Sequence, residues 1–520
     1  MSSDQQSNAE NTDRPLKATR MNNANKKPHS SSKTRRSSFY AEGSGRKPNR
    51  QRRKYSVTAR RALPAVSVLL LLIAVVFAAG CQWGSKDISP PVEPPDSFSS
   101  SGDAAVPDRW WTAFDHQGLN TIVDRALTSN FSLKTAWQRL QAAQAAVDQE
   151  TAALFPHVDV FGQGEVNRTD GETTESLRVG ATATYELDLW GKIQSRIEAE
   201  RYRRKASLQD YQAAALSLSA EIARTAFRLT AARKRVRILN EQISTNKDIL
   251  ELLESRFANG QTRRADVLRQ RQLVKSTRQQ KAVTGATIGV LEHQLAVLMG
   301  QPPQQAVEYH PQSLPDLPAL PDAGVPVKLV HRRPDVRAAY NRVRAADQDL
   351  AVAVTQQYPR LTFDVSLASR EDTANQLFEN WARSFAADIT APLLDAGERK
   401  AQVARRRAQK KQRLYEYGDT ILTAFREVED ALIEEDRQKQ QIQDLEERVR
   451  IADETYQQLR REYINGVSDF SEMLNALDDQ QALRRDLVSA KLKLMEFRIA
   501  LYRALAGGFE TARQTGSDET

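Results

Sequence analysis

Cysteine is almost absent from this chain of 520 residues, since Cys81 is the only one. A single thiol cannot form an internal disulfide, and one cysteine with six scattered histidines supplies no set of ligands at zinc spacing. The sequence also lacks a glycine-rich phosphate loop, a G-x-S-x-G elbow and a cluster of histidines with carboxylates. These absences argue against a disulfide framework, a bound metal or cofactor, and an enzyme.

Charge is missing from one stretch, residues 62–80, which is rich in Leu, Val and Ala and follows Arg60 and Arg61. A basic segment before an apolar run is typical of a signal peptide. A transmembrane anchor with an incidental cysteine is the alternative, because a run of this length just spans a bilayer. The residues that end the run distinguish the two interpretations.

The run ends in "AAGC", which resembles the lipobox of bacterial lipoproteins, with Ala78 where such sequences usually have leucine. The resemblance implies cleavage before Cys81 and a covalent diacylglycerol and N-acyl lipid on that residue. Two or three acyl chains would anchor the protein stably, at about 0.8 kcal/mol for each buried methylene. Gln82, by resemblance to enterobacterial lipoproteins, favours the outer membrane over the inner one.

The N-terminal extension, residues 1–61, is strongly basic, with 16 Lys and Arg against 4 Asp and Glu. The whole chain has a net charge of +9, so residues 62–520 carry −3. The extension is rich in Ser and Asn and is predicted to be disordered in isolation. Because the extension is too long for an ordinary signal peptide, we hypothesise that translation begins at Val57 through an alternative start codon. A codon for Val57 that cannot initiate translation would contradict this hypothesis.

Residues 81–108 are predicted to be the lipidated cysteine followed by a Pro/Ser-rich linker, 84–108, that forms no core and spaces the folded body from the lipid. Beyond it the chain contains an internal duplication. Four landmarks recur in the same order at offsets of 203 to 207 residues: Phe155 and Tyr358, Gly191 and Gly397, Gly260 and Gly466, Gly300 and Gly507. We therefore predict two repeats, 109–310 and 311–509, and a disordered tail, 510–520.

Alternating side chains predict two strands in each repeat. In residues 175–190, apolar positions from Leu177 to Leu189 alternate with polar ones, and residues 381–391 alternate similarly. About ten residues per strand suits a membrane barrel, although a half-solvated sheet in a soluble protein shows the same alternation. Four strands cannot close a barrel of useful bore, so other subunits must supply more, and three subunits would give twelve.

Long helices are the second feature of each repeat. Residues 190–258 and 398–465 contain no proline and little glycine, and have a coiled-coil composition that predicts rods of about 100 Å. Four shorter helices are predicted beside them, stacked end to end in pairs: about 117–153 with 262–299, and about 328–357 with 468–505. In "RRPDV", Pro334 and Asp335 are predicted to start a helix and cap it, a structural role.

These motifs resemble the outer membrane efflux protein family, in its lipoprotein branch. The likeness runs from Trp110 to about Phe509 and is carried by "RWWTAFDHQGLNTIVDRALTSN", "YELDLWGKI", the paired NG turns, "HRRPDVRAAYNRVRAADQDLAVA" and "LYRALAGG". It implies a mainly α fold with a small β part, in which a homotrimer forms a twelve-stranded transmembrane β-barrel and a helical periplasmic tunnel. It also implies a passive outer-membrane conduit for drugs or other small molecules, docked by a periplasmic adaptor (membrane fusion) protein and an inner-membrane pump of the RND type.

The NG turns break the helices because both residue types tolerate positive φ. By resemblance these turns lie at the periplasmic tip, where each residue is either an adaptor contact or simply solvated surface. The candidates are Asn259, Gly260, Arg263, Arg264, Asn465, Gly466, Ser468 and Asp469.

The gate candidates follow the second turn. The resemblance matches the family's gate positions to Ser471, Asn475 and Asp478, and Asn475 stands where the family has an aspartate. Asp478 and Asp479 would supply an acidic ring instead, and Asp266 is the analogous residue of the first repeat. Symmetry-related carboxylates near an axis raise one another's pKa and favour cations, although charged positions on helices are usually just solvated.

The main alternative function is a lipid-anchored periplasmic coiled-coil adaptor or scaffold protein. Adaptors carry one helical hairpin flanked by lipoyl-like and barrel segments. This sequence instead predicts two long hairpins and paired alternating strands, which favours the channel.

Overall fold

The computed structural model describes residues 89–516. The predicted extension, the signal segment, Val57 and the lipidation site at Cys81 therefore lie outside the described residues. The part that is described belongs to one unit of the chain, Gly80–Thr520.

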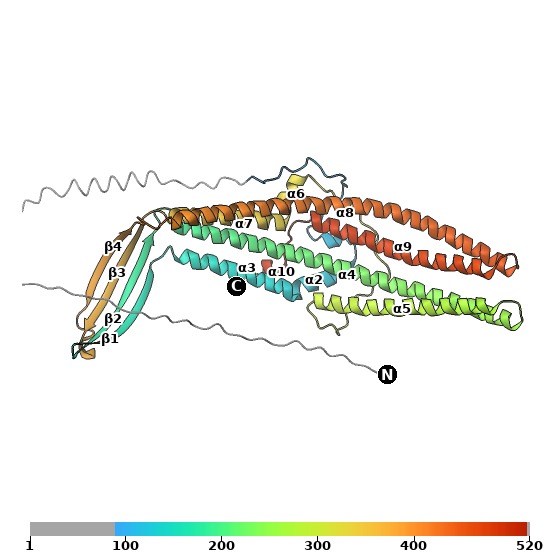
Figure 1. Cartoon of the computed structure of the whole chain (residues 1–520), viewed down its shortest axis with the longest axis horizontal. Helices are drawn as coiled ribbons and strands as arrows, with labels where there is room; N and C mark the ends of the chain where they lie inside the picture. The colour runs from blue at the N-terminus through green and yellow to red at the C-terminus, as the bar shows by residue number, and fades with distance from the viewer. Residues whose placement is uncertain (1–88, 517–520) are drawn as a thin grey trace, which may run out of the picture. The chain divides into compact units, whose positions relative to one another are not determined.

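Each repeat has the same succession of elements, shown in Figure 1. The first repeat contains η1 (Trp110–Phe114), α2 (Gln117–Ser129), α3 (Phe131–Ala152), β1 (His157–Thr169), β2 (Glu172–Leu187), α4 (Lys192–Ala258) and α5 (Arg264–Leu298). The second contains α6 (Pro326–Arg332), α7 (Pro334–Thr355), β3 (Arg360–Glu371), η2 (Ala374–Gln376), β4 (Ala382–Thr390), α8 (Glu398–Ile464) and α9 (Phe470–Leu505), and α10 (Ala512–Thr515) follows.

The two long helices confirm the predicted duplication. Helices α4 and α8 are each 67 residues long and begin 206 positions apart. At 1.5 Å per residue each is about 100 Å long. Both begin after a glycine with positive φ, Gly191 at 71° and Gly397 at 89°, a conformation that a side chain would disfavour. Among residues 89–516, no helix combines the length and the apolar character that a membrane crossing requires.

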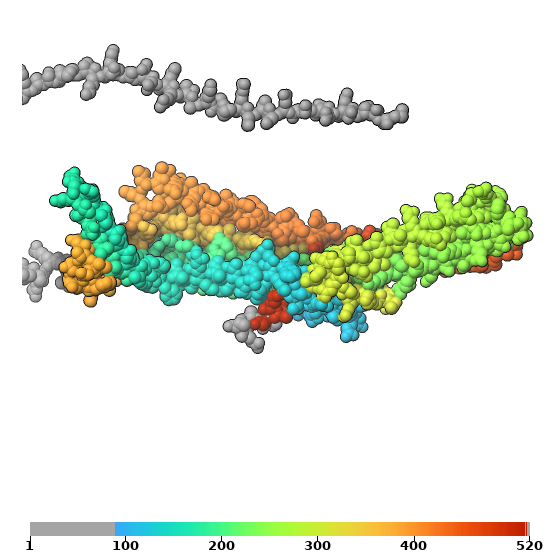
Figure 2. All heavy atoms as spheres, turned by 90° about the horizontal axis from the view of Figure 1, so that it is seen from below, coloured from blue at the N-terminus to red at the C-terminus, as the bar shows by residue number. Residues whose placement is uncertain are grey.

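The shorter helices pack along the long ones. Helices α3, α2 and α5 contact α4, and α7 lies between α4 and α8, while α9 packs on α8. Figure 2 shows α3, α2 and α5 following one another along one face of this unit. The strands leave from one end of the long helices, and the α4–α5 and α8–α9 turns lie at the other (Figure 1).

The strands form one antiparallel sheet in the order β1-β2-β3-β4. Its register confirms the predicted faces, because Val158 pairs with Ala183, which in turn pairs with Val365. Residues that pair directly point to the same side, so the apolar residues of all four strands share a face. Among residues 89–516 nothing covers that face: Val160 is 84% exposed and Phe385 71%.

The main core joins the start of the first repeat to the end of the second. Trp110 and Trp111 are fully buried. The Trp110 ring stacks on Tyr502 at 5.8 Å, its Nε1 donates to Ser219 Oγ at 2.9 Å, and Phe509 packs on Trp111 at 5.0 Å. Aromatic pairs of this kind contribute about 0.5–1.5 kcal/mol each beyond area burial. The "RWWTAF" motif is therefore structural.

Two predicted helices are interrupted. The helix expected over 117–153 breaks at Asn130, whose side chain accepts a hydrogen bond from Leu133 N at 3.0 Å and so begins a new helix. The helix expected over 328–357 breaks between Arg332 and Pro334 because proline cannot continue it. Pro334 begins α7, as predicted.

The predictions for both ends of the described chain are wrong in part. In the Pro/Ser-rich segment, Phe98 is 8% exposed and packs on Phe425 in a core cluster, and Ser99 N donates to Glu429 at 2.9 Å. In the tail, Thr511 is buried and bonds Tyr211 at 2.6 Å, and α10 follows it. Composition missed both segments because their partners, such as Phe425 and Tyr211, are distant in the sequence.

Candidate functional site

The turn between α4 and α5 reverses the chain over residues 259–263 and begins at the predicted NG pair. Asn259 ends α4, and its Nδ2 donates to Ser255 O at 3.0 Å. Gly260 has φ 71°, which lets Gln261 N donate to Arg256 O at 2.8 Å. This bond satisfies a carbonyl at the helix end that would otherwise lack a donor. The turn residues are exposed, apart from the half-buried Thr262.

The turn between α8 and α9 repeats this geometry. Asn465 ends α8, Gly466 has φ 75°, and Val467 N donates to Glu462 O at 2.8 Å. Val467 is 77% exposed, which leaves an apolar side chain at the tip, and Asp469 begins α9 with its side chain free of any capping bond. Ser468, also predicted as a contact, is half-buried, with Oγ donating to Leu459 O at 3.4 Å.

The predicted tip residues of the first repeat divide into two groups. Arg263 and Arg264 are exposed at the start of α5. Asp266 is 3% exposed and accepts from Arg263 Nε at 3.2 Å and from Thr262 Oγ1 at 3.3 Å. This carboxylate is therefore used locally, and the geometry favours a role in holding the turn over a role in a gate.

The predicted gate residues of the second repeat share one side of α9. Asn475, Asp478 and Asp479 are exposed, and Ser471 one turn before them is half-buried. Spacings of four and seven residues place Ser471, Asn475 and Asp478 on one helical face. Within residues 89–516, Asp478 and Asp479 have no ion-pair partner. They are thus free carboxylates, as an acidic ring requires.

A buried polar cluster behind this face was missed by the sequence analysis. We call it the amide lock, and it comprises Gln242, Asn246, Gln270, Thr277, Gln481 and Arg485. Asn246 and Gln481 exchange two hydrogen bonds, Gln481 Nε2 to Asn246 Oδ1 at 2.8 Å and Asn246 Nδ2 to Gln481 Oε1 at 3.2 Å. Both are almost completely buried, and they tie α4 to α9. In the sequence, the only indication of their role is that an uncharged polar residue occupies a helix position whose spacing matches that of the buried apolar residues.

Further contacts extend the amide lock. Gln242 Nε2 donates to Gln481 O at 2.9 Å, and Arg485 Nη1 donates to Gln242 Oε1 at 2.7 Å. Gln270 of α5 donates to Asn246 O at 2.8 Å. Desolvation by burial is the main cause of the lowered pKa of Arg485, which nearby Asp478 partly opposes. The acidic face and the amide lock therefore interact electrostatically.

An apolar cluster closes the tip on the other side of the lock. It joins residues of all four hairpin helices: Leu253, Val267, Tyr456, Phe470, Met473 and Leu477. The two hairpins are thus held together by both apolar and polar contacts.

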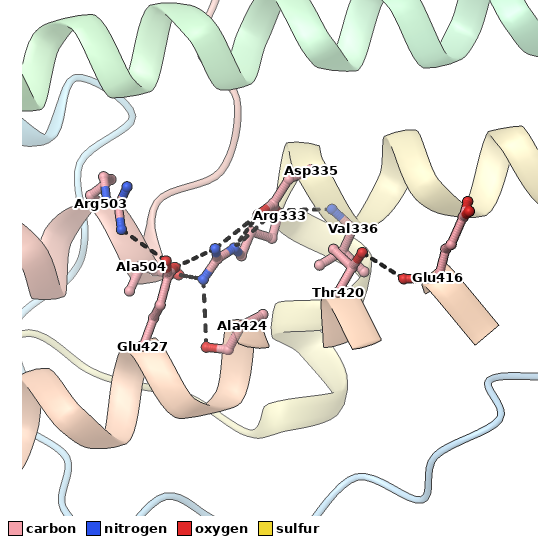
Figure 3. Close-up of polar contacts among 9 residues, drawn as sticks. All are labelled: Arg333, Asp335, Val336, Glu416, Thr420, Ala424, Glu427, Arg503 and Ala504. Atoms are coloured by element: carbon pink, nitrogen blue, oxygen red, sulfur yellow. Dashed lines mark hydrogen bonds and ion pairs between the residues drawn. The ribbon is translucent and has the colours of Figure 1, made fainter. Parts of the chain in front are cut away.

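A buried arginine, Arg333, stabilises the junction between α6 and α7, which is separate from the α4–α5 and α8–α9 turns. Figure 3 shows Arg333 among Asp335, Glu427 and the carbonyls of Ala424 and Ala504. Arg333 Nη2 pairs with Asp335 Oδ2 at 2.8 Å, and Asp335 Oδ1 accepts from Val336 N at 2.9 Å. Asp335 is thus a structural residue, in line with its predicted role.

The chain was compared with known protein families and structures. The family described as "Outer membrane efflux protein" matches residues 122–301 and 325–507, which correspond to the two repeats. The pyoverdine export outer membrane protein OpmQ of Pseudomonas putida is 30% identical over 450 residues, covering 82% of this chain and 94% of that protein. Outer membrane protein OprJ of Pseudomonas aeruginosa is 27% identical, covering 86% and 97%.

A solved structure gives the same result. The outer-membrane channel OprN superimposes with a TM-score of 0.76 at 27% identity, covering 81% of this chain and 98% of that one.

Proposed function

We propose, from the premise that this chain belongs to the outer membrane efflux protein family, that three copies assemble into a twelve-stranded barrel continued by a helical periplasmic tunnel. The chain is an outer membrane efflux component, as its relatives are. What we add is the homotrimer, the docking of its tips by an adaptor and an RND-type pump, and its role as a passive conduit for drugs or other small molecules without catalysis.

The unpaired sheet edges are the observation that carries the trimer. Strands β1 and β4 are the outer strands of the sheet, and each has a strand partner on one side only among residues 89–516. An outer strand exposes a row of unpaired N–H and C=O groups, which a bilayer does not tolerate. The uncovered apolar face, with Ile389 74% exposed, fits a lipid surround. Pairing β1 of one copy with β4 of the next satisfies both requirements.

The exposed tips support the docking proposal. The α4–α5 and α8–α9 turns expose backbone groups and side chains that include Arg263, Arg264 and Val467. Adaptor proteins would contact these turns, while the free carboxylates of Asp478 and Asp479 line the narrow end of the tunnel. A separate adaptor or scaffold function has less support, because the matched relatives are outer-membrane proteins and the match covers nearly their whole length.

Cross-linking between copies tests the trimer. In a Cys81→Ser background, Asp159→Cys on β1 is combined in turn with cysteines along β4, from Arg383 to Ile389. We expect disulfide-linked multimers at one register. As a control, Thr182→Cys with Ser366→Cys, which pair directly between β2 and β3, should link only within one chain. A detergent-extracted protein that is monomeric by mass, and water-soluble once its anchor is removed, would refute the trimer.

Lipid attachment at Cys81 is a separate proposal, supported by the "AAGC" sequence. Cells grown with labelled palmitate should incorporate label into the wild-type chain and into Ser85→Ala, the matched control. Cys81→Ser should incorporate none. Equal labelling of all three chains would contradict the assignment.

A further inference from the structure

The start of α8 has a larger excess of positive charge than the start of α4. Its first sixteen residues, 398–413, carry eight Lys and Arg and one carboxylate. The equivalent sixteen residues of α4, 192–207, carry six Lys and Arg and two carboxylates. Since the two helices are copies of one unit, the first repeat shows what this position looks like with a smaller excess.

Half of the α8 cations are paired with carboxylates. The pairs are Arg399 with Asp395 at 2.9 Å, Arg406 with Asp349 at 3.8 Å, Lys410 with Asp347 at 2.6 Å, and Arg413 with Glu416 at 2.7 Å. The other four, Lys400, Arg405, Arg407 and Lys411, are exposed and form no ion pair with any residue in 89–516.

The second repeat keeps one cation and has lost its acidic partner. Arg407 corresponds to Arg201 at the 206-residue offset. Arg201 pairs with Glu198 at 2.6 Å, three residues earlier on the same helix. Ala404 takes the place of that glutamate in the second repeat, so the guanidinium of Arg407 is left uncompensated.

The same change affects a second cation. Lys411 corresponds to Lys205, whose ammonium lies 4.9 Å from the centre of the Tyr202 ring, in a cation–π contact. Ala408 replaces this tyrosine in the second repeat. The second repeat thus has alanine in place of both the carboxylate and the aromatic ring that contact these cations in the first repeat, which leaves Arg407 and Lys411 free for a partner outside the chain.

Lys400, Arg407 and Lys411 lie on one face of α8, which we call the cationic stripe. Gly418 continues this face, because steps of seven, four and seven residues at 100° each stay within about 40°. The N-terminal segment packs on the face at Gly418, where an added Cβ would lie 2.8 Å from Pro91 Cγ.

This contact indicates that the stripe faces the outside of the tunnel. From Pro91 back to the proposed lipid anchor at Cys81 there are ten residues, which reach about 33–36 Å when extended. From Gly418 back to Lys400 is about 27 Å of helix. With Cys81 anchored in the membrane that surrounds the barrel, Pro91 lies on the outer side of the tunnel, so the inference rests on the proposed anchoring.

The stripe also begins close to the membrane-facing sheet (Figure 1). Only residues 391–397 separate β4 from α8, and among them Leu393 is 99% exposed and Leu394 93%. Measured from Glu398, the first residue of α8, Lys400 lies about 3 Å along the axis, Arg407 about 14 Å and Lys411 about 20 Å. Surface potentials decay over about 8–10 Å, so Lys400 lies within reach of the headgroup charges, whereas Arg407 and Lys411 lie beyond one decay length and feel them less.

We propose that the cationic stripe binds the phosphate headgroups of anionic phospholipids in the periplasm-facing leaflet of the outer membrane. The first repeat has no equivalent surface, so each subunit contributes one lipid contact. Cations near an anionic surface strengthen binding by roughly fivefold each. The contact would fix how deeply the barrel sits, through Lys400 most and through Arg407 and Lys411 progressively less.

Lipid retention by the detergent-solubilised full-length protein tests the proposal. Fluorescent phosphatidylglycerol or phosphatidylcholine is titrated into the protein, and bound lipid is measured at low and high salt. Wild type should prefer phosphatidylglycerol, and salt should weaken the preference. Lys400→Gln with Arg407→Gln and Lys411→Gln should lower phosphatidylglycerol affinity at least fivefold.

Two further variants isolate the charge. Ala404→Glu restores the acid of the first repeat beside Arg407 and should weaken the preference with every cation still present. Arg201→Gln with Lys205→Gln, the matched control, should stay within twofold of wild type. An unchanged triple variant, an equally impaired control, or tighter binding of a soluble peptidoglycan fragment than of the lipid would overturn the proposal. If wild type retained neither lipid, the proposal that the sheet lies in the membrane would itself be contradicted.

Discussion

The amide lock makes a prediction about the coupling of the two hairpins. Asn246→Ala removes both hydrogen bonds to Gln481, which is 2% exposed and has no access to water as a replacement partner. Leaving a buried polar group unsatisfied costs about 1–3 kcal/mol. Within the first hairpin the variant removes one further contact, the bond from Asn246 Nδ2 to Thr277 Oγ1 at 3.2 Å, so most of the cost falls on the packing of α9 against α4.

Hydrogen–deuterium exchange measures this cost locally. A loss of 1–3 kcal/mol raises the population of the open state about 5-fold to 150-fold, and exchange near Asn246 and Gln481 should rise accordingly. Exchange within the Trp110 core should not change. In planar bilayers the variant should visit higher-conductance states more often, since the hairpins separate more readily.

A double variant separates the hydrogen bonds from the packing. Asn246→Leu with Gln481→Met replaces both polar partners by apolar groups of similar size, which is nearly neutral when the shape is kept. Its exchange should return close to wild type. A single variant that exchanges like wild type, or a double variant as open as the single one, would refute the assignment of the lock.

Other parts of the structure give further expectations. Asp478→Ala with Asp479→Ala should raise single-channel conductance, and unchanged conductance would refute their gate role. Glu435→Gln should cost roughly 3–5 kcal/mol, because it leaves Arg498, which is 0% exposed and lies 2.6 Å from Glu435, as a buried unpaired charge. Desolvation by burial, the largest single influence on Glu435, raises its pKa, but the bonds to Arg498 and Lys439 together outweigh it, so the pKa of Glu435 is lowered. The stabilisation by ionised Glu435 is therefore complete above the ordinary glutamate pKa of about 4.3 and is lost as pH falls through the lower pKa of the folded state. Denaturant titrations at several pH values should show this loss in wild type and not in the variant. Phe98→Ala should lower the free energy of unfolding by about 3 kcal/mol, and an unchanged denaturation midpoint would contradict the docking of the N-terminal segment.

Local patterns were sufficient for most of the architecture. The paired NG turns located both hairpin tips, because Gly260 and Gly466 adopt the positive φ that a side chain disfavours. Alternation predicted the sheet faces, and Pro334 marked a helix start. Each of these signals acts between residues close together in the chain, so it is readable without knowing the fold.

Partners distant in sequence were not readable. Asn246 and Gln481 are 235 positions apart, and Phe98 docks on a helix more than three hundred residues later. Nothing near these residues distinguishes them from ordinary surface or linker side chains. Asp266 was predicted from its position in the sequence to be a gate carboxylate. In the structure it is buried and pairs with Arg263.

The sequence by itself thus determined the repeated unit, its long helices, its turns and its alternating strands, because spacing along the chain encodes them. Only the tertiary structure decided which polar groups are buried against each other and which cations remain free. That outcome depends on how the two repeats pack, and burial is a property of all the neighbours of a side chain rather than of its own segment.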